Sequence, residues 1–328
     1  MNTSHQDRNH PGSDLLAELL ELDAEVLRAH LSELTAWLGE LADREPRRIV
    51  DLGSGTGTGA IALARRFVRA DVTAVDLSPR MLHRLSKKAS LLGLADRVLG
   101  VRADLTEGWP ALAPCDLVWA ASSLHDMADP DRVLAGAFDG LRPGGLLAVT
   151  EMDFFPRFLP DDIGVGRPGL EARVHAVLNK GPAADWTEHL ARAGFVLEAE
   201  RPWAVDLPTP LPAATGRYAQ VCLRRLRSHL DGRLPDEDLV ALDTVIHGDG
   251  PHGVLRREDL TVRTVGPRGW LAGPDRPAGG RTRTDARPGH HRPLAGFSAG
   301  PGAGDAAGAA HPCGGHRLRR GSPAGSAQ

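Results

Sequence analysis

Three aspartates between residues 51 and 104 end apolar runs, where their carboxylates could bind one ligand together. Asp51 opens the glycine-rich turn DLGSGTG (51–57), Asp76 lies in DVTAVDL (71–77), and Asp104 ends RVLGVRAD (97–104). Glycines in such a turn let the backbone approach a ligand, with helix N–H groups pointing at it. A carboxylate at Asp76 can accept both hydroxyls of a ribose, and one at Asp104 can accept the exocyclic amine of adenine.

The glycine turn alone does not identify the ligand, because dinucleotide-binding proteins use a similar turn. Counted from Gly53, the last glycine of a GxGxxG motif would fall on Thr58. Counted from Gly55, Ala60 takes that place, which is a tolerable match. One strand-end aspartate is usually a helix cap, whereas three in register indicate a ligand site.

These residues need a sheet whose strands end at one edge. Strand-like runs cover residues 48–53, 71–77, 97–104, 115–121 and 145–152. Helix-like runs lie between them at about 58–68, 79–92 and 130–140. This alternation predicts an α/β fold, a parallel sheet with helices on both faces and a ligand at its carboxyl edge. Ser78-Pro79 is typical of a helix start.

Residues 13–47 form a separate N-terminal segment. Apolar residues at helical spacing from Ser13 to about Ala42 predict two amphipathic helices, with Asp23 as a cap between them. The polar residues 1–12 predict a disordered start. The two helices could be a lid over a substrate or could merely cover a sheet edge, and the sequence leaves both open.

Residues 154–265 continue the fold less regularly. Residues 154–181 contain Pro and Phe and predict an insertion, and a helix follows at about 183–193. We expect a sixth strand at 195–207, then a helical insertion at about 208–258 with helices at about 216–230 and 235–246. DLTVRTV (259–265) begins like a seventh strand.

Residues 266–328 differ in composition from the rest of the chain. They hold 15 of the 38 glycines and eight prolines, with nine Arg and three Asp but no Val, Ile, Lys or Glu. So few large apolar residues predict a disordered tail. We hypothesise that the tail is out-of-frame translation that interrupts the seventh strand near Val265; a native low-complexity tail is the alternative, and translating the other two frames separates them.

Composition excludes several classes of protein. The net charge is −3, and because the tail is basic, residues 1–265 are clearly acidic, which argues against nucleic-acid binding through phosphates. No apolar run approaches the roughly 18 residues of a membrane span, and the N-terminus lacks an apolar signal segment. The three cysteines form neither a disulfide framework nor a metal pair. We therefore expect a cytoplasmic protein without a metal site.

The motifs resemble those of a known family. VDLGSGTG, VDLSPRML, RADL and LRPGGLLAVTEMD match, in order and spacing, motifs of class I S-adenosylmethionine (SAM) dependent methyltransferases, firmly over 48–153 and loosely over 13–265. SSLHDMADPDRVL is similar to the segment after strand four in the small-molecule subgroup that includes ubiquinone/menaquinone-type C-methyltransferases. The resemblance implies a Rossmann-like doubly wound, mostly parallel sheet over 48–265. Its seventh strand would lie antiparallel between strands five and six.

The resemblance also implies SAM as cofactor, S-adenosylhomocysteine as product, and a set of cofactor contacts. The glycine turn would pass under the methionine part, Asp76 would hold the ribose, and Asp104 would take the adenine amine. The implied cofactor-binding residues are Asp51, Gly53, Ser54, Gly55, Thr56, Gly57, Asp76, Leu77, Met81, Asp104, Leu105, Ala121 and Ser122. Met81 could equally be a core residue of its helix.

Methyl transfer from a sulfonium is an in-line displacement, which rests on positioning and needs a general base only if the acceptor must lose a proton. His125, just past strand four, is the candidate base, although it could instead cap or pack a helix start. Glu151 and Asp153 could orient an acceptor or could be solvated. Cys115 and Asp116 lie at the opposite end of strand four, which argues against a cysteine nucleophile or a metal-dependent catechol-type site.

The acceptor is therefore expected to be a small organic molecule, whose methylated atom the sequence does not specify. The segment after strand four reads AASS, which lacks the motif of enzymes that methylate base amines. The N-terminal helices, the region 207–250 and the three phenylalanines Phe154, Phe155 and Phe158 are expected to surround the acceptor. Two alternatives remain: a SAM-binding protein without catalysis, and an NAD-dependent oxidoreductase, against which Asp104 and LRPGG count.

Overall fold

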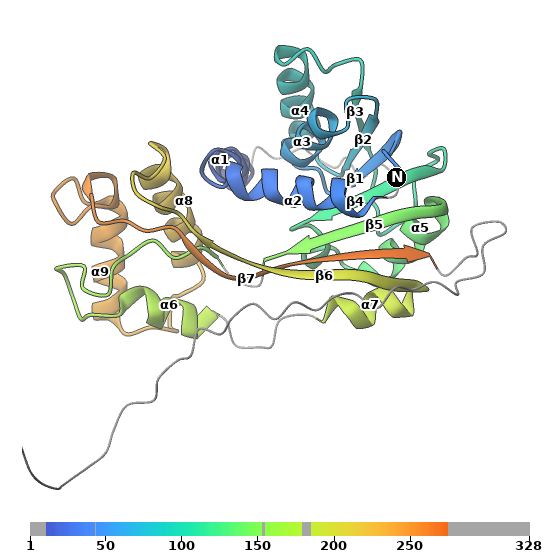
Figure 1. The fold of residues 1–328 in the computed structure, drawn as a ribbon. Helices are drawn as coiled ribbons and strands as arrows, with labels where there is room; N and C mark the ends of the chain where they lie inside the picture. Colours follow the sequence, from blue (N-terminus) through green and yellow to red (C-terminus); the bar gives the residue numbers. More distant parts are fainter. Residues whose placement is uncertain (1–10, 43, 153–154, 179–184, 275–328) are drawn as a thin grey trace, which may run out of the picture. The chain divides into compact units, whose positions relative to one another are not determined.

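A computed structural model describes residues 11–42, 44–152, 155–178 and 185–274. Within them lies a seven-stranded sheet with the order β3-β2-β1-β4-β5-β7-β6 (Figure 1). The strands are β1 (Arg48–Leu52), β2 (Asp71–Asp76), β3 (Val98–Arg102), β4 (Cys115–Ala121), β5 (Leu141–Glu151), β6 (Phe195–Asp206) and β7 (Arg263–Pro274). The first five pair in parallel, and β7 pairs antiparallel with both β5 and β6. The predicted mostly parallel α/β sheet is confirmed.

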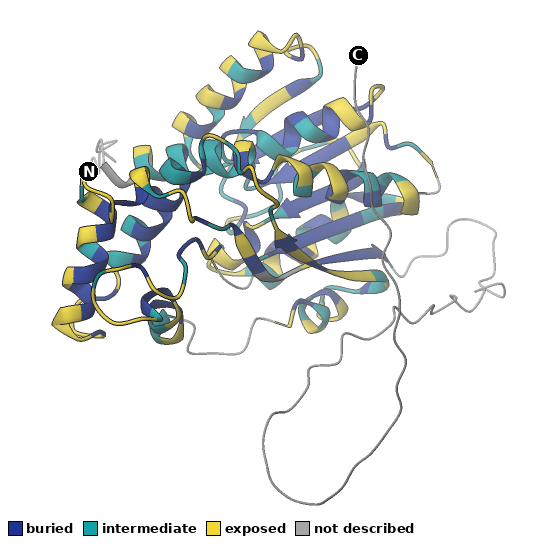
Figure 2. Ribbon diagram, turned by 60° about the vertical axis from the view of Figure 1, so that its left-hand side comes forward, coloured by how far each residue is buried: buried dark blue, intermediate teal, exposed yellow. Residues whose placement is uncertain are grey.

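Helices cover both faces of this sheet. The helices are α1 (Pro11–Val26), α2 (Arg28–Leu41), α3 (Thr58–Arg66), α4 (Pro79–Leu91), α5 (Pro130–Gly140), α6 (Leu170–Leu178), α7 (Trp186–Arg192), α8 (Thr215–Arg227) and α9 (Asp236–His247), with 3₁₀ turns η1 (Leu124–Asp126) and η2 (Val254–Arg256). One apolar core joins the sheet to α2, α3 and α4, and another joins it to α5 and α7. Figure 2 shows most of the central strands buried and the outer helix faces exposed.

Two of these helices begin at capping residues, and for α4 this is the start expected from Ser78-Pro79. The Ser78 hydroxyl accepts from the backbone N–H of Met81 at 3.4 Å, with proline at the first helical position of α4. Asp129 caps α5 in the same way, accepting from Arg132 N at 3.0 Å. Such caps satisfy N–H groups that a helix cannot pair internally. They fix where each helix leaves the carboxyl edge of the sheet.

A third core lies beside the end of β6 and joins α6, α8, α9 and η2 to the end of α1. The helices α8 and α9 correspond to those expected in the insertion at about 208–258. The helix α6 lies inside the segment 154–181, for which the sequence predicted only an insertion. Phe158 is fully buried here, with its ring edge-on to Tyr218 at 5.2 Å between centroids, so it is a core residue and not a substrate contact.

The N-terminal helices also form, but Asp23 does not cap either of them. It lies within α1, where its carboxylate accepts a hydrogen bond from the Tyr218 hydroxyl of α8 at 2.5 Å. Burial raises the pKa of this carboxyl, against the lowering effect of that hydrogen bond. The break between α1 and α2 falls at Leu27 instead. Asp23 therefore joins α1 to α8.

The seventh strand is not interrupted at Val265. It continues to Pro274 between β5 and β6, and Trp270 and Leu271 are 2% and 1% exposed. Gly269 faces Trp203 so closely that a Cβ there would lie 2.6 Å from the indole. The boundary expected at 265 and 266 is therefore wrong for the strand, and the expected tail from 275 to 328 lies outside the described residues, as do residues 1–10. None of the described helices is long and apolar enough to span a membrane.

Candidate functional site

The glycine-rich turn connects β1 to α3 at the carboxyl edge of the sheet. Gly53 has φ +65°, and a Cβ there would lie 2.6 Å from Cβ of Ser123. Gly55 has φ +52°, and a Cβ there would meet a methyl of Leu20 in α1 at 2.9 Å. Only glycine fits both the left-handed backbone and the close approach at these positions. The turn thus lies between the tip of β4 and α1.

Asp51 lies beneath this turn and is 3% exposed. Burial raises the pKa of its carboxyl to about 8, although the backbone N–H of Ala60 donates to it and lowers the pKa. Its Oδ2 and the hydroxyl of Ser54 are buried without a hydrogen-bond partner among the described residues. A ligand that brings positive charge and hydrogen-bond donors to the turn would stabilise both groups. The residues present therefore fit SAM, which carries an ammonium and a sulfonium.

Asp76 ends β2 beside the turn. One oxygen of its carboxylate accepts from the backbone N–H of Gly55 at 2.8 Å, and the other accepts from Ser78 N at 2.8 Å. The acid therefore holds both the glycine turn and the start of α4 in place. The neighbouring Leu77 is 58% exposed, whereas Met81 is 6% exposed on α4. Of these two apolar residues, Leu77 is free to cover a ligand and Met81 packs in the core.

Asp104 follows β3, two residues after the strand ends at Arg102. Its carboxylate accepts from the backbone N–H and the hydroxyl of Thr106, at 2.9 and 2.6 Å. These hydrogen bonds hold the pKa of Asp104 below its usual range. Leu105 is 7% exposed and belongs to the core beneath it. Because β3, β2 and β1 are neighbours, the three predicted aspartates follow one another along one sheet edge.

The tip of β4 completes this edge. Ser122 has φ 48°, an uncommon conformation for a residue other than glycine, and its N–H donates to the Thr150 carbonyl at 2.7 Å. The Ser123 hydroxyl donates to the Leu52 carbonyl at 2.8 Å. Ala121 and Ser122, the two residues expected near the methionine part, thus stand beside Gly53. Hydrogen bonds to β1 and β5 fix their backbone.

His125 and Glu151 form a pair next to this tip. His125 Nδ1 lies 2.6 Å from Glu151 Oε2, while Glu151 Oε1 accepts from the backbone N–H groups of Ser123 and Leu124 at 3.1 and 2.9 Å. The carboxylate is 3% exposed and the imidazole 50% exposed. The hydrogen bond from Glu151 raises the pKa of His125, against a lowering effect of burial. A buried acid thus orients an accessible imidazole, as in a general-base pair.

His125 and Glu151 were both candidates from the sequence, but their pairing was not predicted. Their positions at the tips of β4 and β5 would have indicated it, because parallel neighbours bring their carboxyl ends together. Asp153 and Phe154 lie outside the described residues. Phe155 is 37% exposed near the same edge.

The helix α1 runs over the glycine turn and is tied to both sides of it. Lys88 of α4 lies 2.6 Å from Glu21 and also donates to the hydroxyl of Thr56 in the turn at 3.4 Å. Asp14 pairs with Arg80 of α4, and Arg217 of α8 donates to Glu18 at 2.6 Å. Acidic residues of α1 thus join the sheet domain to the helical region.

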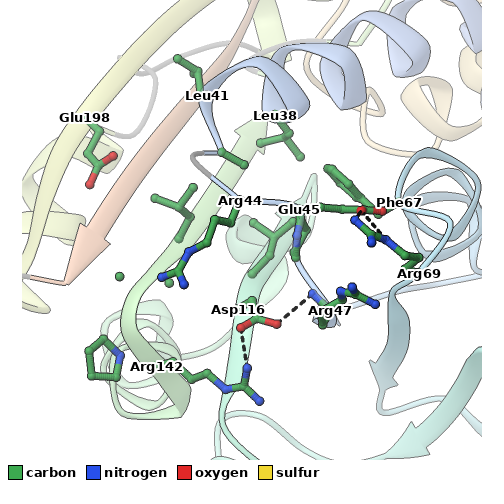
Figure 3. Close-up of a pocket in the computed structure, with 17 residues that line it drawn as sticks. Leu38, Leu41, Arg44, Glu45, Arg47, Phe67, Arg69, Asp116, Arg142 and Glu198 are labelled. Carbon is green, nitrogen blue, oxygen red and sulfur yellow. Dashed lines mark hydrogen bonds and ion pairs between the residues drawn. The ribbon is translucent and has the colours of Figure 1, made fainter. Parts of the chain in front are cut away.

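A separate pocket of about 1340 Å³ lies at the opposite, amino edge of the sheet (Figure 3). There Asp116 accepts from the backbone N–H groups of Arg47 and Arg48 and from the Arg142 side chain, at 2.8, 2.8 and 2.7 Å. Burial raises the pKa of the adjacent Cys115 thiol to about 12, so this thiol is a poor nucleophile. Both residues lie at the end of β4 remote from His125, as the sequence predicted. Among the described residues no cluster of three or more His, Cys, Asp or Glu could hold a metal ion.

Comparison with known proteins points to the same chemistry. Residues 49–145 match a family described as a methyltransferase domain. Malonyl-[acyl-carrier protein] O-methyltransferase of Laribacter hongkongensis is 33% identical over 189 residues, which cover 54% of this chain and 61% of that protein. Demethylmenaquinone methyltransferase of Thermus thermophilus is 34% identical over 142 residues, covering 43% and 61%.

Trans-aconitate 2-methyltransferase of Pseudomonas aeruginosa is 32% identical over 142 residues, covering 40% of this chain and 49% of that protein. The chain thus spans between about half and three-fifths of the length of these curated relatives. The matched segment holds the glycine turn, Asp76, Asp104 and the tip of β4. The match over residues 49–145, these relatives and the antiparallel β7 between β5 and β6 make the chain similar to the class I SAM-dependent methyltransferases.

Proposed function

We propose that this protein transfers a methyl group from SAM to a small organic acceptor. The observation that carries the proposal is that the cradle for an adenine nucleoside and the His125–Glu151 pair share one sheet edge. Asp51 and Asp76 lie at the ends of β1 and β2, Asp104 follows the neighbouring β3, and His125 follows β4 on the other side of β1. This placement brings a cofactor site and a proton acceptor together.

The residues that would hold SAM follow from their places at this edge. Asp76 would bind the ribose and Asp104 the adenine amine, while Gly53, Ser54, Gly55, Thr56 and Gly57 with Asp51 would border the methionine part. Leu77 would supply the exposed apolar surface against the adenine, with the buried Leu105 and Met81 supporting it from the core. Ala121 and Ser122 would border the methionine part from the side of β4.

When bound, SAM supplies a methyl group activated by its sulfonium. The chain's own contribution is position, exclusion of water and proton transfer. Glu151 is fixed by two backbone N–H groups and orients His125 through Nδ1. Nε2 of His125 then takes a proton from an acceptor such as a hydroxyl. The raised pKa of His125 makes it a stronger base once it is neutral.

We further propose that α1 is a lid over the cofactor. Its Leu20 lies over Gly55, and its Glu21 binds Lys88 beside Thr56. An exposed or partly exposed ion pair contributes little free energy, about 0–1 kcal/mol. The ion pairs of α1 can therefore open at a modest cost, while Asp23 and the buried Val26 keep its C-terminal end attached to α8 and the third core.

Two measurements test the proposal. Calorimetry with SAM, S-adenosylhomocysteine and NAD should show binding of the first two only, and Asp76→Asn should weaken it. Methyl-labelled SAM incubated with a metabolite extract should then yield labelled product, which also identifies the acceptor. Binding of NAD but not SAM would refute the proposal that SAM is the cofactor. SAM binding without turnover in any extract would indicate a binding protein without catalysis.

A further inference from the structure

Arg225 of α8 lies against an aromatic ring and not against a carboxylate. Arg217 pairs with Glu18, and Arg227 pairs with Asp243 and Asp231. Arg225 is only partly exposed, and no carboxylate of the described residues lies within ion-pair distance of its guanidinium. Its Cζ lies 5.9 Å from the ring centroid of Phe155 instead. A half-buried guanidinium that meets an aromatic face and no acid can bind a further anion.

The place of Arg225 relates it to the site of methyl transfer. Phe155 lies four residues after Glu151, which orients His125. Arg225 is also close enough to His125 that its positive charge lowers the pKa of the imidazole, in opposition to Glu151. Phe155 follows the end of β5 and His125 follows the end of the neighbouring β4, so Arg225, which contacts Phe155, lies on the side of α8 beyond these strand ends.

We propose that the methyl acceptor carries a carboxylate that Arg225 binds while Phe155 contacts the adjoining apolar part. The assignment rests on the proposed function, because it names the substrate class of the same site. A guanidinium offers two parallel N–H donors, which match the two oxygens of a carboxylate. A single arginine supplies one positive charge, which suits a carboxylate better than a phosphate dianion. The acidic groups that face this region, Glu151 and Asp126, further disfavour a dianion.

The test compares an anionic and a neutral probe of equal shape. Benzoate and benzamide are titrated by ligand-observed NMR into the full-length protein, both free and saturated with S-adenosylhomocysteine. The wild-type protein is expected to bind benzoate more tightly than benzamide. Arg225→Gln should lower the affinity for benzoate about tenfold or more and leave the affinity for benzamide unchanged. Arg225→Lys keeps the positive charge but loses the two parallel N–H donors, so its benzoate affinity should lie between those of wild type and Arg225→Gln. Thermal melting of each variant checks folding.

Arg224→Gln is the matched control, because Arg224 lies on the same helix with His247 as its neighbour at 3.5 Å. It should bind benzoate as wild type does. Equal affinity of wild type for both probes, no benzoate binding by wild type, or an equal effect of the two glutamine variants would overturn the assignment. Absence of S-adenosylhomocysteine binding would instead refute the proposed function, and the titrations of the free protein test Arg225 independently of it.

Discussion

Substitution of Glu151 by glutamine tests the proposed base most directly. Glutamine has nearly the same shape, so its oxygen can still accept from Ser123 N and Leu124 N, which lie 3.1 and 2.9 Å from Glu151 Oε1. The amide nitrogen then faces His125 Nδ1 in place of the oxygen 2.6 Å away. Because an amide nitrogen only donates, Nδ1 must accept, and the imidazole proton moves to Nε2. Nε2 can then no longer take a proton from an acceptor.

The expected loss follows from the usual contribution of a general base. Proton transfer by a positioned side chain contributes about 10²–10⁴-fold to rate, so Glu151→Gln should lower turnover at neutral pH by about 10² or more. SAM affinity should not change. His125→Gln should cause a similar loss, and the double variant should be no slower than either single variant, because the two residues act as one unit.

The pH profile gives an independent measurement. Glu151 raises the pKa of His125 above the ordinary 6.5, so wild-type turnover should still rise with pH above that value as the imidazole loses its proton. His125→Gln should remove this rise. Wild-type rates in Glu151→Gln, or an unchanged pH limb in His125→Gln, would refute the reasoning.

The raised pKa of His125 also predicts that the stability of the fold depends on pH. A raised folded-state pKa means that the His125–Glu151 pair stabilises the fold fully below the unfolded pKa of histidine, and that this contribution is lost as pH rises through the folded pKa. In urea unfolding, Glu151→Gln should therefore lower the free energy of unfolding, relative to wild type, more at about pH 5.5 than at about pH 9. The half-exposed imidazole limits this difference to about 0.5 kcal/mol.

Four other substitutions probe the cofactor edge, the lid and the last strand. Gly53→Ala should abolish SAM binding in calorimetry, since the left-handed backbone alone costs about 1–2 kcal/mol and the new Cβ would lie 2.6 Å from Ser123. Asp76→Asn should weaken SAM about tenfold or more, a loss that unchanged calorimetric affinity would contradict. Glu21→Gln should speed SAM release in stopped-flow measurements by less than about fivefold, and 1 M salt should erase the difference. Trp270→Ala should destabilise the fold by about 3–5 kcal/mol in urea, and a change below about 1 kcal/mol would show that β7 is not integral to the sheet.

Local patterns predicted well the sheet edge at which Asp51, Asp76 and Asp104 lie. The strands that carry Asp51 and Asp76 are apolar runs bounded by turn residues, and each aspartate falls at the end of its strand. The sequence predicts that these aspartates meet, because parallel strands place all their carboxyl ends at one edge of the sheet. Contacts between residues far apart in the chain could not be predicted from such local patterns. Nothing near Asp23 shows that its partner is Tyr218, almost two hundred residues later.

The end of β7 was missed for a different reason. Residues 266–274 read GPRGWLAGP, which lacks the β-branched residues and regular alternation typical of a strand. Hydrogen bonds from β5 and β6 on both sides hold this stretch in the sheet, and the bulges opposite it on β6 take up its irregular register. Tertiary context therefore overrides local propensity here. The His125–Glu151 pair was missed for another reason, since it follows only when the tips of the parallel neighbours β4 and β5 are compared with each other.

The place of β7 has a consequence for the order in which the protein can be assembled on the ribosome. β6 joins the sheet only through β7, which follows it by more than fifty residues in the chain. Until that last strand emerges, β6 has no partner and β5 presents an open edge, a state that invites pairing with other chains. The edge proposed to bind SAM, built from β1 to β5, can form earlier. Nascent chains stalled before residue 263 should therefore be the aggregation-prone intermediates, and a SAM-like ligand could bind the first half of the sheet before the second is closed.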